Sequence, residues 1–169
     1  ARRQAGSSFK PLVYALAFSR MDGDGMPLYT AADTVPNMRR TFENTDGWRP
    51  RNVGGKYTAT VPLAQALAAS SNIGTASLLE ELGGPRHLVD FADRLGFEKR
   101  WLPEELGLAL GQGEVTPLEM ASFSAAVING GRKATGSPVL LARDAAQQIP
   151  VGALSQERPV MSPEAAALT

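Results

Sequence analysis

The first residues with the potential for chemistry are a serine and a lysine near the start of the chain, Ser7 and Lys10. On a helix, residues three apart lie on one face, so the Lys10 amine can reach the Ser7 hydroxyl. An apolar run, residues 12–18, follows directly, and partial burial beside it would favour the neutral amine. A neutral amine can accept the serine proton and make Ser7 a nucleophile without a histidine. Taken alone, this pattern is common by chance and more often consists of an exposed serine cap and a solvated lysine.

A second polar cluster, Ser70-Ser71-Asn72, lies between two expected helices. It can present a hydroxyl and an amide to a cleft. Serine and asparagine side chains also compete for backbone hydrogen bonds, so the cluster alone is more often a helix N-cap. The two clusters acquire a chemical meaning only in combination.

Composition narrows the chemistry that is available. The chain has 169 residues, 43% of them hydrophobic, which suits one folded domain or a piece of a larger one. Acidic and basic residues number 17 each, which argues against a general nucleic-acid binder because phosphate recognition needs an excess of Lys and Arg. Cysteine is absent and His87 is the single histidine, so no metal site and no cofactor is expected.

The expected elements are mainly helical. Hydrophobic and capping patterns predict helices over residues 11–19, 61–69, 73–82 and 85–95. A further helix begins at Pro117, with Thr116 as N-cap and Glu119 at the third position, and runs to Ile128. Residues 21–60 are expected to be irregular, with short extended pieces at 28–30 and 56–60. Residues 138–143 and 148–151 are candidate strands.

Segments spread over nearly the whole chain resemble the transpeptidase domain of class A, bifunctional penicillin-binding proteins. The segment around Ser7 is similar to the one that carries the family's nucleophile, although Ala5 stands where the family has proline. Ser70 and Asn72 match its second motif, Ser-x-Asn. The residues that carry the resemblance are 3–11, 48–52, 61–63, 66–72, 110–121 and 129–131.

The resemblance implies both a fold and an activity. The fold is α+β, of the penicillin-binding protein and serine β-lactamase type, with a helical subdomain beside a five-stranded antiparallel sheet; this chain would hold mostly the helical part with few strands. The activity is that of a serine-type D-Ala-D-Ala transpeptidase that cross-links peptidoglycan stem peptides. Ser7 would be the nucleophile and Lys10 the general base. Ser70 would relay a proton to the leaving nitrogen, and Asn72 would bind the donor amide and steady Lys10.

The resemblance also implies partners, a location and a boundary. Stem peptides and β-lactams would bind, and the domain would be extracytoplasmic, anchored in the membrane only through parts of the parent protein outside this chain. The family's third motif, Lys-Thr/Ser-Gly, lies on a strand further along. The nearest string here is Lys133-Ala134-Thr135-Gly136, which has an inserted alanine; Lys133 is therefore interpreted as a surface residue. Residues 1–169 are expected to be a partial transpeptidase domain that stops before that strand.

Two other functions stay open. A serine β-lactamase or β-lactam sensor on the same fold differs in needing a base that activates water, for which Glu104 and Glu105 are the candidates. A non-catalytic helical scaffold could retain the motif residues, and the missing third motif is its best support. His87 is interpreted as a surface or helix-end residue rather than a catalytic one.

Overall fold

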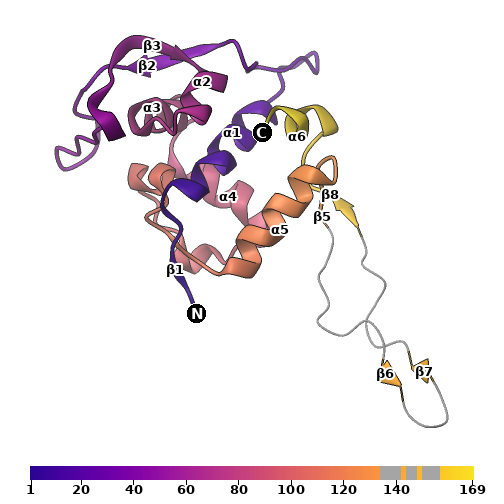
Figure 1. Ribbon diagram of the computed structural model, residues 1–169. Coiled ribbons are helices and arrows are strands. Elements are labelled where there is room, and N and C mark those ends of the chain that lie inside the picture. Colours follow the sequence, from indigo (N-terminus) through magenta and orange to yellow (C-terminus); the bar gives the residue numbers. More distant parts are fainter. Residues whose placement is uncertain (134–141, 144–147, 150–156) are drawn as a thin grey trace.

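A short helix, α1 (Lys10–Phe18), runs through the centre of the molecule. The computed structural model describes residues 1–133, 142–143, 148–149 and 157–169. Every residue from 12 to 18 is buried, and α3, α4 and α6 all pack against α1 (Figure 1). An apolar run without a polar face is typical of a helix enclosed on all sides. Pro11 lies in the first turn, where a missing N–H leaves no hydrogen bond unmade.

The other helices surround α1. They are α2 (Leu63–Ala68), α3 (Asn72–Glu81), α4 (Pro85–Leu95), α5 (Pro117–Ile128) and α6 (Pro163–Leu168). Four 3-10 turns join them: η1 (Gly6–Phe9), η2 (Val53–Gly55), η3 (Lys99–Trp101) and η4 (Leu106–Leu110). The capping box expected at α5 is confirmed, because Thr116 and Glu119 exchange side-chain-to-backbone hydrogen bonds.

Strands in the described residues form four antiparallel pairs. They are β1 (Arg3–Gln4) with β4 (Glu114–Val115), β2 (Thr34–Asn37) with β3 (Thr58–Pro62), β5 (Arg132–Lys133) with β8 (Arg158–Pro159), and β6 (Ala142–Arg143) with β7 (Gln148–Ile149). The β2–β3 pair lies across α2 and α3 at the top of Figure 1. Because these sheets are small and helices surround the core, the chain has the expected α+β character with few strands.

Several element boundaries differ from the sequence-based expectations. Val61 and Pro62 belong to β3 rather than to the following helix, because Val61 pairs with Val35 and the backbone of Pro62 is extended. The extended piece expected at 28–30 is instead β2, at Thr34–Asn37. Helix α6 was not predicted, although Ser162 caps it and Pro163 begins it. The candidate strands at 138–143 and 148–151 are confirmed only at Ala142–Arg143 and Gln148–Ile149; their other residues lie outside the described part.

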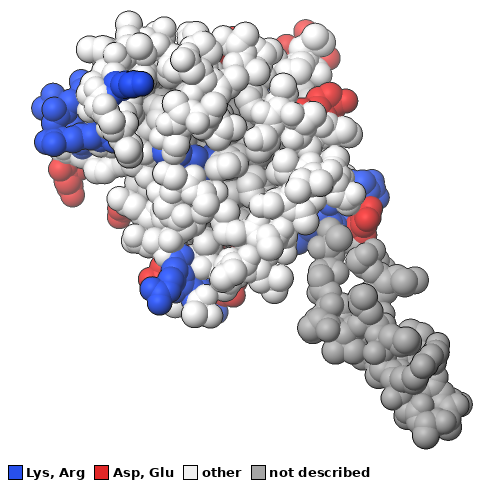
Figure 2. Space-filling view, in the orientation of Figure 1, with Lys and Arg blue, Asp and Glu red and all other residues white. Residues whose placement is uncertain are grey.

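Charges on the face shown in Figure 2 are gathered in small groups, with Lys and Arg concentrated at its upper left. Most of the face between these groups is uncharged (Figure 2). None of the helices in the described ranges is both long enough and apolar enough to cross a bilayer.

Candidate active site

The amine of Lys10 lies at the centre of the predicted site. Its side chain is only 1% exposed, and its Nζ donates hydrogen bonds to the Ser70 carbonyl oxygen at 2.5 Å, Ser70 Oγ at 2.9 Å and Asn72 Oδ1 at 2.6 Å. An ammonium has three N–H donors, so all of them are used. Burial lowers the pKa of Lys10 from its ordinary 10.5 to about 8, because a desolvated site disfavours the charged form.

Ser70 lies in a tight turn that joins α2 to α3. Its φ is 51°, in the left-handed region that residues with a side chain rarely occupy. The turn is held by backbone hydrogen bonds from Ser70 N to the Leu67 oxygen and from Ser71 N to the Ala66 oxygen. This backbone conformation lets both the carbonyl and the hydroxyl of Ser70 face the Lys10 amine. Strained backbone of this kind persists where the surrounding structure holds it, often at functional sites.

Asn72 is the first residue of α3, and both ends of its amide are engaged. Its Oδ1 accepts from Lys10, and its Nδ2 donates to the Arg51 carbonyl oxygen at 2.6 Å. One of its two Nδ2 protons is therefore left for another acceptor. The structure thus brings together three of the four residues that the sequence singled out: Lys10, Ser70 and Asn72.

Ser7 is exposed in the 3-10 turn η1, which leads directly into α1. Within the described ranges, its hydroxyl makes no hydrogen bond, to Lys10 or to any other residue. The turn is anchored where Gly6 N donates to the Gly111 oxygen at 3.2 Å. A Cβ at Gly111 would collide with the backbone of Gly6, so the two segments approach more closely than side chains permit.

Sequence reasoning missed the residues that hold the second motif in place. Asn52 Oδ1 accepts from the backbone N–H groups of Asn72, at 2.9 Å, and Ile73, at 3.0 Å. Asn37 Oδ1 accepts from Asn52 Nδ2 at 2.9 Å and from Ser71 Oγ at 2.8 Å. Asn52 belongs to a segment that carries the family resemblance, but nothing in the local pattern indicates what it contacts. Asn37 gives no sequence signal of its role.

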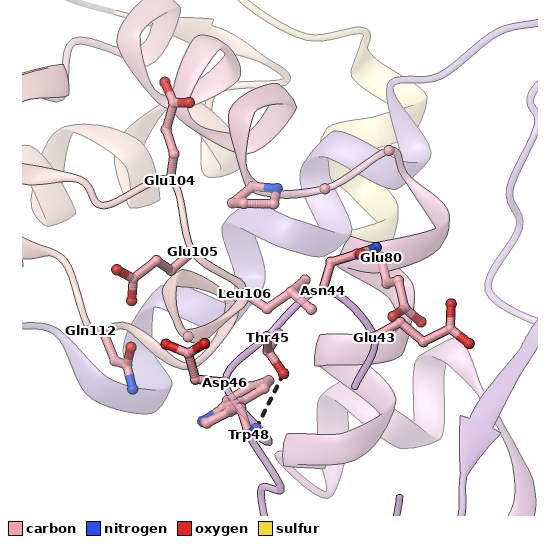
Figure 3. A pocket seen from close by; sticks show the side chains of 14 residues that line it. Glu43, Asn44, Thr45, Asp46, Trp48, Glu80, Glu104, Glu105, Leu106 and Gln112 are labelled. Atoms are coloured by element: carbon pink, nitrogen blue, oxygen red, sulfur yellow. Dashed lines mark hydrogen bonds between the residues drawn. The ribbon is translucent and has the colours of Figure 1, made fainter. Parts of the chain in front are cut away.

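A separate acidic cleft, about 810 Å³ in volume, lies elsewhere on the molecule (Figure 3). Five carboxylates line it: Glu43, Asp46, Glu80, Glu104 and Glu105. None of the four predicted site residues is among its lining residues. Glu104 and Glu105, the bases considered for a water-activating reaction, therefore border this cleft rather than contacting the cluster around Lys10.

His87 and Lys133 are two other residues considered from the sequence. His87 is exposed on α4, and its Nδ1 lies 3.1 Å from the Gly83 carbonyl oxygen, as expected for a residue near a helix end. Lys133 is half-buried in β5, while the rest of its Lys-Ala-Thr-Gly string lies outside the described residues. Across the ranges that the structure describes, no three His, Asp or Glu side chains are grouped to hold a metal ion.

Comparisons with known proteins agree on one family. A family model described as the penicillin binding protein transpeptidase domain matches residues 1–168. Penicillin-binding protein 1A of Neisseria cinerea is 38% identical over 133 residues, which cover 78% of this chain and 16% of that protein. The chain therefore spans about a sixth of the length of this curated relative.

Solved structures share the fold. Penicillin-binding protein PonA1 from Mycobacterium tuberculosis superposes with a TM-score of 0.81 at 25% identity, covering 98% of this chain and 45% of that one. The imipenem acyl-enzyme complex of penicillin-binding protein A from M. tuberculosis has a TM-score of 0.81 at 20% identity, covering 98% of this chain and 42% of that one. At 20% identity, the resemblance to penicillin-binding protein A shows a shared fold alone.

The contact between Gly6 and Gly111 predicts an unusually large loss of stability for Gly111→Ala. Gly25 is a matched control, because its φ of +77° nearly equals the +78° of Gly111 but open space surrounds it. Gly25→Ala should lower the free energy of unfolding by about 1 kcal/mol through backbone strain alone. Gly111→Ala should lower it by about 2 kcal/mol more, because the added methyl group collides with backbone. Denaturant titration measures both, and equal losses would contradict the close approach.

The left-handed backbone at Ser70 predicts an inverted preference between glycine and alanine. Both Ser70→Gly and Ser70→Ala remove the hydroxyl, but glycine adopts a φ of 51° without strain. Ser70→Gly should therefore be more stable than Ser70→Ala by about 1 kcal/mol. At the neighbouring Ala69, the C-cap of α2 with a φ of −83°, Ala69→Gly should instead destabilise by about 0.5 kcal/mol, because glycine has more backbone freedom in the unfolded chain. Thermal or denaturant unfolding measures the stability difference between the glycine and alanine forms at each position. If the same residue were the more stable one at both positions, the assigned turn would be contradicted.

Proposed function

The chain belongs to the penicillin-binding protein transpeptidase domain family, and on that premise we propose that it supplies the nucleophile and the first two motifs of a peptidoglycan D,D-transpeptidase. The observation that carries the proposal is the buried Lys10 amine, held by Ser70 and Asn72 at the start of the helix that follows Ser7. The activity is proposed for the protein that contains this chain, because the relatives are much longer.

Acylation begins with attack of Ser7 Oγ on the carbonyl carbon of the penultimate D-alanine of a stem peptide. The Ser7 proton passes to the neutral Lys10 amine, which acts as the general base. A neutral amine has two N–H donors and one lone pair, so it must release one of the three acceptors it now holds. Ser70 Oγ is suited to that change, since a hydroxyl can rotate from accepting a hydrogen bond to donating one.

Collapse of the tetrahedral intermediate breaks the bond between the carbonyl carbon and the leaving nitrogen. Ser70 relays a proton from Lys10 to that nitrogen, so terminal D-alanine leaves as a free amino acid and Ser7 is left as an ester. An amine from a neighbouring stem then attacks the ester carbonyl, an amide forms and Ser7 regains its proton. Asn72 Nδ2 has a second proton that is free of the Arg51 contact, and in this proposal it would donate to the amide oxygen of the donor peptide.

β-Lactams would enter the same path, because their strained amide takes the place of the scissile peptide bond. Ser7 would open the ring, breaking the amide bond and leaving a covalent ester. The imipenem acyl-enzyme of penicillin-binding protein A, a protein of the same fold, supports this expectation. The parent protein would act outside the cytoplasm, where stem peptides lie, with membrane anchoring left to segments other than those described. Residues 1–169 would form one part of a larger transpeptidase domain.

Labelling by a fluorescent penicillin tests the proposal directly. We expect the parent protein to become covalently labelled, and Ser7→Ala to abolish the label because no nucleophile remains. Ser8→Ala is the matched control, since the Ser8 hydroxyl donates to the Ala5 carbonyl oxygen and has no proposed part in catalysis. Labelling that survives Ser7→Ala would exclude Ser7 as the nucleophile. Rapid turnover of nitrocefin would favour a β-lactamase instead.

The pKa of Lys10, about 8, predicts how the acylation rate depends on pH. Only the neutral amine can accept the Ser7 proton, and about one amine in ten is neutral at pH 7. The rate constant for penicillin acylation should therefore rise about tenfold per pH unit below about pH 7, reach half its maximum near pH 8 and level off above about pH 9. Stopped-flow or gel-based labelling across pH 6–10 measures it. A rate constant that stays constant or falls between pH 6 and pH 8 would contradict a general base of this pKa.

A further inference from the structure

The hydrogen-bond roles of the Asn52 side chain follow from its partners. Backbone N–H groups can only donate, so the atom that faces Asn72 N and Ile73 N must be the amide oxygen. The amide nitrogen must then face the two acceptors on the other side, Asn37 Oδ1 at 2.9 Å and the Lys56 carbonyl oxygen at 3.0 Å. The side chain has one correct orientation and all of its contacts are satisfied in it.

These contacts place Asn52 at the start of α3. The first N–H groups of a helix have no partner within the helix and need one from outside. Ser71 Oγ accepts from the third of them, Gly74 N, at 3.0 Å. Asn52 Oδ1 accepts from the first two, so a residue distant in sequence completes the cap. The first turn of α3 is therefore attached to the loop before β3 rather than held by its own sequence alone.

The capped turn is the part of the chain that touches Lys10. Asn72 presents its side-chain oxygen to the amine, and Ser70, two residues earlier, presents its carbonyl and its hydroxyl. We propose that Asn52 is a positioning residue for the second motif. By capping α3, Asn52 sets where Ser70 and Asn72 lie relative to Lys10. The inference rests on the function proposed above, and it adds a residue outside the two motifs to the machinery of acylation.

A second asparagine fixes Asn52 in turn. Asn37 is 6% exposed and uses its oxygen for Asn52 Nδ2 and Ser71 Oγ, so its nitrogen donates to Thr58 Oγ1 at 3.0 Å. Thr58 Oγ1 then donates to the Thr60 carbonyl oxygen at 2.7 Å. Asn52 is thus held between the β2–β3 pair and the helix, and is not a mobile surface amide.

Two substitutions separate the cap from the other contacts of Asn52. Asn52→Ala removes the oxygen that caps α3 and both donors. Asn52→Asp keeps an oxygen for Asn72 N and Ile73 N, where negative charge is also favourable, but loses the donors. The groups that face the Lys10 amine are the neutral ones of Ser70 and Asn72, and no described carboxylate forms an ion pair with it. A new carboxylate near this cluster should therefore raise the pKa of Lys10, whereas a displaced Asn72 oxygen should lower it.

The experiment measures the second-order rate constant for acylation by a fluorescent penicillin from pH 6 to 10, in the full-length parent protein. Asn52→Ala should lower the high-pH plateau by roughly tenfold to 100-fold and move the acid limb to lower pH. Asn52→Asp keeps the capping oxygen but sets its second oxygen against Asn37 Oδ1 and the Lys56 carbonyl oxygen. It should therefore lower the plateau by less than about tenfold, with the acid limb moved to higher pH. Asn129→Ala is the matched control, because Asn129 Nδ2 donates to the Arg132 carbonyl oxygen at an exposed helix end; it should change neither quantity.

Unchanged plateau and limb in Asn52→Ala would overturn the proposal. If that variant does not fold, Asn52→Asp decides alone, and a plateau lowered by about tenfold or more in it would overturn the proposal. Hydrogen exchange of the Asn72 and Ile73 amides tests the cap without any acylation: faster exchange is expected in Asn52→Ala than in the parent, and equal rates would overturn it. Failure of the parent protein to be labelled through Ser7 would instead refute the proposed function. Hydrogen exchange would then still test whether Asn52 caps α3.

Discussion

A buried cation without a buried counter-ion is the constraint on which the rest of this structure depends. The Lys10 amine is almost inaccessible to water, and among the described residues neutral oxygens alone contact it. Burying a charge in this way is unfavourable unless hydrogen bonds replace the lost hydration. The packing of α1 against its neighbouring helices therefore does two things together: it completes the hydrophobic core, and it brings the pKa of Lys10 toward neutral pH.

Local sequence signals predict five of the six helices in the described residues, but not α6. Thr116, Pro117 and Glu119 mark the start of α5 through contacts within four residues, and such contacts can be read from spacing alone. The pairing of Val35 with Val61 could not be read in this way, because it joins two segments separated by an irregular stretch. Val61 and Pro62 precede good helix formers, which is why they were assigned to the helix rather than to β3.

The same distinction between local and distant contacts applies within the site. Ser7, Lys10, Ser70 and Asn72 are singled out because the two short patterns occur together within a family resemblance that spans nearly the whole chain. Asn37 and Asn52 act through hydrogen bonds to residues 15 to 34 positions away in the chain, and asparagine in a loop is too common to indicate such a role. The left-handed backbone of Ser70 and the approach of Gly6 to Gly111 are likewise products of tertiary packing, which no window of sequence contains.

One chain of hydrogen bonds links the start of α3 to β3 and runs in a single direction. Protons point from the start of α3 to Asn52, from Asn52 to Asn37, from Asn37 to Thr58, and from Thr58 to a strand carbonyl. Turning the Asn52 amide over would set donor against donor at α3 and acceptor against acceptor at Asn37. Turning the Asn37 amide over would set its nitrogen against Asn52 Nδ2. The network therefore admits a single arrangement of its hydrogens, and a shift of β2 along β3 would break its link between Asn37 and Thr58. Strand register, which usually concerns only the packing of a sheet, is here tied to the geometry around a reactive amine.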